Sequence, residues 1–128
     1  LSPKKLYQAS SKAREQFSVK STGVDQLMRA LSGGNKQKVN LGRWLIKDLD
    51  VLIVDCPTRG VDIGVKAYIY QCLREAKEKG MAILLITDEL SEVLGMADTI
   101  AVMKDGEICK LLPRSAELSE ETIIEVMT

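Results

Sequence analysis

The chain has 128 residues, which is enough for one domain and too short for two of ordinary size. Its 45% hydrophobic and 28% charged residues argue against disorder, and 18 basic side chains balanced by 18 acidic ones argue against a generally basic nucleic-acid-binding protein. The sequence contains no histidine, which excludes a histidine base, a Ser-His-Asp triad and a histidine metal ligand within the chain.

The first 47 residues are predicted to be mainly helical. Ser2 followed by Pro3 is typical of a helix start, with serine as the N-cap and proline in the first turn. Residues 18–30 form a polar connector, in which residues 24–29 predict a short turn or helix. Ser32–Gly34 predict a break in the structure, and the apolar spacing that follows predicts a helix of about three turns.

Two short apolar runs predict strands. Val51–Val54, which lead into Asp55, and Ile83–Ile86 are continuous runs typical of strands buried on both faces of a parallel sheet. Between them, Asp62 is predicted to cap a helix that ends at Gly80. The order strand, helix, strand predicts a parallel pair joined by a right-handed crossover.

The last third of the chain predicts a hairpin flanked by helices. A short helix is expected over residues 91–95 and a strand over residues 100–103. The dipeptide Asp105-Gly106 predicts a two-residue hairpin turn, and Ser119 is expected to start the final helix. The fold class is therefore α/β with a helical piece in front. Three aromatic residues inside the predicted helices are interpreted as core or packing residues: Trp44, Tyr68 and Tyr70.

Three segments are candidates for chemistry. The glycines of Ser32–Gly34 let a ligand approach the backbone at the positive end of a helix, which suits phosphate. Asp55 ends a buried strand, where a carboxylate can serve Mg²⁺ directly or through water. Pro57–Asp62 form a tight loop that leads into a helix. Each segment taken alone is also compatible with an ordinary helix cap or turn.

The order of these segments is more specific than any one of them. Leu31–Asn35, the strand ending at Asp55, the loop to Asp62, and the later strings Glu89–Asp98 and Val102–Ile108 follow one another along the chain. This order resembles the C-terminal half of an ATP-binding cassette (ABC) ATPase over residues 20–128. Within that superfamily it is most similar to the second cassette of the two-cassette ATPases of bacterial monosaccharide importers of the ribose, xylose and galactose type.

The resemblance implies one partial P-loop NTPase domain over residues 1–128. Residues 1–47 would hold the remainder of the helical subdomain and the signature helix. Residues 48–128 would run from the Walker B strand to the C-terminal helix, with parallel strands, a β-hairpin and flanking helices. Since this is only half of a cassette, we expect the sheet to expose an edge and an apolar face that the other half would cover.

The resemblance also implies a role for each candidate residue. The signature motif would contact the γ-phosphate of ATP held by the opposite cassette, through the Ser32 side chain and the amides of the two glycines; its residues are Leu31, Ser32, Gly33, Gly34 and Asn35. Asp55 would be the Walker B aspartate that serves Mg²⁺ through water. The D-loop, which crosses the interface between cassettes, would consist of Thr58, Arg59, Gly60, Val61 and Asp62.

Three departures from the family pattern indicate that this chain alone does not hydrolyse ATP. The Walker A loop that would cradle the phosphates is not found, because the nearest string, residues 60–67, lacks the spacing and the hydroxyl. Cys56 stands where the family has a catalytic glutamate, and a thiol is mostly neutral at pH 7. Asp88 stands at the switch-histidine position, and its charge would repel phosphate. The signature motif can still act on the opposite cassette's ATP.

The expected cofactors are ATP and Mg²⁺ in the complete assembly. The expected partners are a second cassette, an integral-membrane permease and, indirectly, a solute-binding protein, with no nucleic acid. Three cysteines without framework spacing indicate a reducing compartment, and no apolar run approaches the roughly 18 residues that span a bilayer. We therefore expect a peripheral protein on the cytoplasmic face of the bacterial inner membrane.

Two alternatives remain open from the sequence. The chain could be a non-catalytic interaction or regulatory module that keeps the cassette fold, which the residues at positions 56 and 88 favour. It could also be an ATPase of the same superfamily that acts in DNA repair or translation. The transported solute is not encoded here, because the permease and the binding protein would select it.

Overall fold

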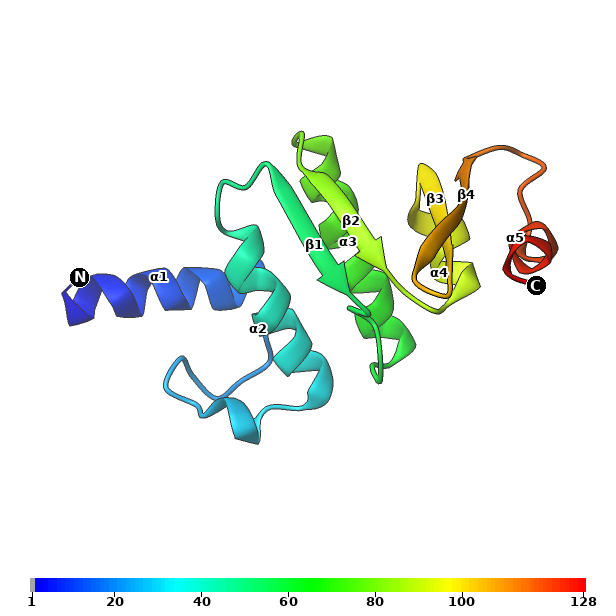
Figure 1. Cartoon of the computed structure of the whole chain (residues 1–128). Helices are drawn as coiled ribbons and strands as arrows, with labels where there is room; N and C mark the ends of the chain where they lie inside the picture. Colours follow the sequence, from blue (N-terminus) through cyan, green and yellow to red (C-terminus); the bar gives the residue numbers. More distant parts are fainter. Residues whose placement is uncertain (1) are drawn as a thin grey trace. The chain divides into compact units, whose positions relative to one another are not determined.

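The computed structural model describes residues 2–128 (Figure 1). The chain divides into two compact units, residues 1–84 and residues 85–128. The elements in chain order are α1 (Pro3–Gln16), a short 3-10 helix η1 (Met28–Ala30), α2 (Gly33–Leu45), β1 (Val51–Asp55), α3 (Ile63–Glu78), β2 (Ala82–Ile86), α4 (Leu90–Met96), β3 (Thr99–Lys104), β4 (Glu107–Pro113) and α5 (Glu120–Met127). The α/β fold class predicted from the sequence is confirmed.

The first helix starts as predicted. The Ser2 side chain accepts a hydrogen bond from the Lys5 amide at 3.3 Å, and Pro3 occupies the first turn, where its missing N–H leaves no gap in the helix. In α1, whose residues are all described, no side chain is buried. The helix is instead anchored at its end by Phe17, which is buried and packs against Gly42 of α2. A side chain at position 42 would collide with the Phe17 ring, because its Cβ would lie 2.7 Å away.

One prediction for this helical part is wrong in detail, and another is narrowed. Gly33 and Gly34 form no break before α2, because the cap bond to Ser32 fixes them in the helix's first turn. Trp44, interpreted as a core or packing residue, lies at the surface as a packing residue: it is 39% exposed, and the cations of Arg43 and Lys47 lie 4.9 and 4.5 Å from its ring. Such cation–π contacts let an aromatic ring remain at the surface with favourable neighbours.

Strands β1 and β2 form a two-stranded parallel sheet, and their arrows point the same way in Figure 1. Helix α3 connects them and contributes a buried stripe of Ile69, Leu73 and Ala76. The Asp62 side chain accepts from the Val65 amide at 3.0 Å and caps the helix, as predicted. After α3, Gly80 adopts a φ of +98°, which glycine tolerates without strain.

The strands are not buried on both faces. In β1, Leu52 and Val54 are buried while Val51 and Ile53 are about 60% exposed, and β2 alternates in the same sense. The prediction of strands covered on both sides is therefore wrong for this chain, since a continuous apolar run does not reveal which neighbours are present to cover it. The expected open apolar face is confirmed.

The second unit is built on the antiparallel hairpin of β3 and β4. Asp105 and Gly106 have φ values of +52° and +83°, the positive pair that a tight two-residue hairpin turn requires. The hairpin prediction is thus confirmed. The core of this unit consists of four buried residues from β3, β4 and α5, namely Ile100, Val102, Leu112 and Ile123. Side chains of α4 pack against them.

Two isoleucines of α3 provide a matched test of this packing. Ile69 is fully buried, whereas Ile63 is 86% exposed. We expect Ile69→Ala to lower the free energy of unfolding by about 2–5 kcal/mol, because it leaves a cavity in the core. Ile63→Ala should change it by no more than about 0.5 kcal/mol. Urea unfolding followed by circular dichroism measures both, and equal effects would contradict the described packing.

Candidate functional site

The start of α2 presents a capping serine followed by two glycines. Ser32 is the N-cap, and its Oγ accepts hydrogen bonds from the Asn35 backbone amide at 3.3 Å and from Asn35 Nδ2 at 2.9 Å. Gly33 and Gly34 supply the first helical amides, which have no acceptor within any α-helix. Ser32 and Gly33 are exposed. Together with the positive end of the helix dipole, these groups suit a phosphate oxygen.

The two glycines serve different purposes. A Cβ on Gly34 would lie 2.7 Å from the Val65 side chain at the start of α3, so glycine there permits the close contact of two helices. A Cβ on Gly33 would meet nothing within 4 Å, so this position opens to solvent. Leu31 is buried and anchors the segment rather than lining its surface. Within the segment from Leu31 to Gly34, Ser32 and Gly33 are therefore the residues that face outward.

Asp55 ends β1 at the carboxyl edge of the parallel pair and is exposed. The next residue, Cys56, has a φ of +45°, a conformation that residues with side chains rarely adopt. A hydrogen bond from the Arg59 amide to the Cys56 carbonyl oxygen, at 3.2 Å, closes the turn. The chain therefore bends sharply behind the carboxylate and leaves it at the edge where ligands of parallel sheets gather.

The loop from Thr58 to Asp62 is part interior and part surface. Thr58 is 1% exposed and belongs to the interior of the unit. Arg59 and Gly60 are exposed, and Gly60 has a φ of +72° that permits the turn. Val61 is half-buried, and Asp62 is occupied as the cap of α3. A partner at this loop would therefore meet mainly Arg59 and Gly60.

The structure brings the signature segment and this loop together within the first unit. Gln37 Nε2 donates to the Pro57 carbonyl oxygen at 2.7 Å, and Gly34 contacts Val65 across the same helix pair. Neither tie was foreseen from the sequence, since both depend on the tertiary pairing of α2 with α3. In the sequence, the one hint of the hydrogen bond to Pro57 was that Gln37 stands one helical turn after Gly33. The hydrogen bond and the close contact hold the start of α2 against the loop that leads into α3.

Asp88 lies in the second unit, between β2 and α4, and is exposed, while its neighbours Thr87 and Glu89 are half-buried. The neighbouring Thr87 Oγ1 accepts from the Glu89 amide at 3.1 Å, which fixes a tight turn at the end of the strand. The role of Asp88 as the counterpart of a switch histidine stays a prediction.

Two titratable groups on α3 belong to the contact with α2 instead of the candidate site. Lys38 Nζ lies 4.5 Å from the Tyr68 ring centroid. Burial raises the pKa of the Tyr68 hydroxyl, and the hydrogen bond between Tyr68 and Cys72 raises it further. Burial also raises the pKa of the Cys72 thiol. Both groups therefore remain neutral at pH 7 and contribute packing rather than a nucleophile.

Carboxylate and thiol side chains are the groups of this sequence that could ligate a metal ion. Among residues 2–128, no three cysteine or carboxylate side chains are grouped closely enough to hold an ion. Asp55 could contribute one carboxylate to a Mg²⁺ ion whose other oxygen ligands come from phosphates and water, which is the usual way proteins bind this ion.

Comparison with curated proteins identifies close relatives, although no protein-family model matches the chain. The chain is 46% identical over 114 residues to the ribose import ATP-binding protein of Lactococcus lactis subsp. lactis (strain IL1403), covering 89% of this chain and 23% of that protein. It is 44% identical over 119 residues to the L-arabinose transport ATP-binding protein of Geobacillus stearothermophilus, covering 93% and 23%. The chain spans about a quarter of the length of these relatives.

Comparison with solved structures defines the fold class. The ADP conformation of MJ1267, an ATP-binding cassette of an ABC transporter, superimposes with a TM-score of 0.77 at 28% identity, covering 98% of this chain and 51% of that chain. The fold is therefore that of an ATP-binding cassette, in agreement with the resemblance seen in the sequence. The chain belongs to the ABC ATPases, and its relatives within them are sugar-import ATP-binding proteins.

The different surroundings of the two glycines give a stability test. Gly34→Ala should lower the free energy of unfolding by about 1–3 kcal/mol, because the new methyl group overlaps Val65. Gly33→Ala should change it by no more than about 0.5 kcal/mol, since its methyl group enters open space. Urea unfolding of the two variants decides, and a larger loss for Gly33→Ala would contradict the described first turn of α2.

Proposed function

We propose that this chain is part of the ATP-binding subunit of an importer, which couples ATP binding and hydrolysis to uptake of a monosaccharide or a similar small solute. The observation that carries the proposal is the open start of α2, where Ser32 and Gly33 are exposed and Gly34 is fixed against α3. The likeness to ribose and arabinose import proteins supports the solute class.

In this proposal the start of α2 binds the terminal phosphate of ATP held by an opposite cassette. The Ser32 hydroxyl donates to a phosphate oxygen, and the Gly33 and Gly34 amides add two donors at the positive helix end. ATP would supply the charge and the binding energy that bring two cassettes together. Leu31 is buried behind this surface and holds the segment in place.

The remaining motifs serve the same interface. Asp55 would hold Mg²⁺ through water at the end of β1, and Arg59 and Gly60 would meet the opposite cassette at the exposed part of the D-loop. The tie from Gln37 to Pro57 would make the D-loop move with the signature helix. Residues 1–47, with the remainder of the helical subdomain, would lie next to the permease.

This chain does not supply the groups that complete hydrolysis. Cys56 replaces the carboxylate that would orient water, and Asp88 replaces a histidine donor. Loss of a general base typically lowers the rate by about 10²–10⁴-fold, and loss of a positioned transition-state donor by about 10²–10³-fold. The chain therefore contributes binding in trans to an ATP site whose chemistry is completed by other segments.

The proposed partners are a second cassette, an integral-membrane permease and, through it, a solute-binding protein. The proposed location is the cytoplasmic face of the bacterial inner membrane. None of the helices within residues 2–128 has the length and apolar character needed to span a bilayer. The 18 basic and 18 acidic side chains offer no general attraction for nucleic acid.

A charge placed at the open glycine tests the proposal. In the complete ATP-binding subunit, we expect Gly33→Asp to lower ATP hydrolysis by about 10²–10³-fold, because a carboxylate would stand where the phosphate binds. The matched control is Gly23→Asp, since a Cβ at that position also meets nothing within 4 Å. A steady-state phosphate-release assay compares them. Equal activity of the two variants would overturn the proposed phosphate contact.

A second candidate function is a non-catalytic regulatory module that keeps the cassette fold. Cys56 at the glutamate position favours it. The variant Cys56→Glu in the complete subunit discriminates between the two, measured against a background in which the glutamate at the equivalent position of the opposite cassette is changed to glutamine. We expect about a tenfold or larger gain in ATP hydrolysis, less than a full general-base contribution because Asp88 remains. The absence of any gain would favour the regulatory module.

A further inference from the structure

The side chain of Asn35 joins two segments that lie 15 residues apart. Its Oδ1 accepts a hydrogen bond from the Lys20 backbone amide at 2.8 Å. Its Nδ2 donates to Ser32 Oγ at 2.9 Å. Because a backbone N–H can only donate, the bond to Lys20 fixes which end of the amide is oxygen, and the nitrogen is thereby directed at Ser32. Both ends of the Asn35 amide are thus used within the chain.

These bonds determine what the Ser32 hydroxyl can do. Its oxygen accepts from the Asn35 backbone amide at 3.3 Å as well as from Asn35 Nδ2. A hydroxyl has two lone pairs and one proton, so two accepted bonds leave the proton as the group's remaining hydrogen-bonding capacity. Accepted bonds also polarise the hydroxyl and strengthen it as a donor. The hydroxyl is therefore prepared to donate to an anionic oxygen.

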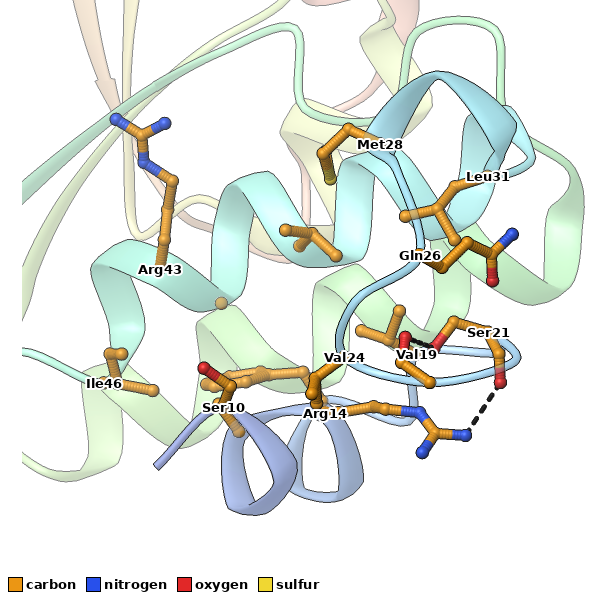
Figure 2. A pocket seen from close by; sticks show the side chains of 15 residues that line it. Ser10, Arg14, Val19, Ser21, Val24, Gln26, Met28, Leu31, Arg43 and Ile46 are labelled. Atoms are coloured by element: carbon orange, nitrogen blue, oxygen red, sulfur yellow. Dashed lines mark hydrogen bonds between the residues drawn. The ribbon is translucent and has the colours of Figure 1, made fainter. Parts of the chain in front are cut away.

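The connector that holds Asn35 is itself anchored on both sides of Lys20. Arg14 donates from its guanidinium to the Ser21 carbonyl oxygen at 2.7 Å, a bond drawn in Figure 2 at the edge of the cavity between α1, the connector and α2. Lys38 Nζ donates to the Ser18 carbonyl oxygen at 3.1 Å. The connector is thus tied to α1 at one point and to α2 at another, and the Lys20 amide lies between them.

We propose that Asn35 is a positioning residue, which orients the Ser32 hydroxyl as a donor to the ATP phosphate and makes that orientation depend on the connector at residues 18–21. This inference rests on the proposed function, because it assigns the bond that prepares the same phosphate contact. It gives Asn35 a role of its own within the signature motif, behind the contact assigned to Ser32 and the two glycine amides. A shift of the connector away from α2 would release the Asn35 side chain and remove one of the two bonds that direct the Ser32 hydroxyl.

The test uses the complete ATP-binding subunit with four variants: Asn35→Ala, Ser32→Ala, the double variant, and the control Asn40→Ala. Asn40 is an exposed asparagine on the same helix. We expect Asn35→Ala to lower kcat about tenfold with little change in KM, because the Ser32 hydroxyl loses one neutral hydrogen bond that orients it. Asn40→Ala should stay within about twofold of the parent. Thermal unfolding of each variant checks that the fold is retained.

The double variant separates positioning from a general structural effect. If Asn35 acts through Ser32, adding Asn35→Ala to Ser32→Ala should change kcat by less than about twofold. A further tenfold loss in the double variant would overturn the proposal, and so would an Asn35→Ala variant as active as the control. The proposed function fails separately: an active parent enzyme that is unaffected by Ser32→Ala would show that Ser32 makes no phosphate contact at all.

Discussion

The contact between the starts of α2 and α3 is the constraint on which the candidate site depends. Gly34 leaves room for Val65, and Gln37 reaches the backbone at Pro57. Both ties hold the first turn of one helix beside the loop that leads into the other. Because the interior of a protein is closely packed, two helices joined in this way move together rather than bending independently. The open first turn, which carries Ser32, is therefore held on a rigid support.

Local chemistry was sufficient to predict most of the elements. The caps at Ser2, Asp62 and Ser119 and the turn at Asp105-Gly106 follow from residues that stand within four positions of one another. Such bonds are made within a short segment, so the sequence contains all of the information needed. The signature segment was found in the same way, although its glycines lie inside the helix and not before it.

What could not be predicted depends on residues far apart in the chain. The burial of β1 on one face only reflects which layers are present around it, and an apolar run does not encode its neighbours. The sequence left open whether Trp44 is a core or a packing residue, and the two cations that give its ring a favourable surface setting are known only from the structure. The bond from Asn35 to Lys20 spans 15 residues and has no local signature.

Trp44 is the single tryptophan of the chain, and it lies in the last turn of α2. Its fluorescence therefore comes from one known place, at the opposite end of the helix from Ser32. The Arg43 and Lys47 cations that flank the ring belong to the same helix end, so fraying of this end would alter both the solvent around the indole and its charged neighbours. The molecule carries a native optical probe of its central helix without any added label.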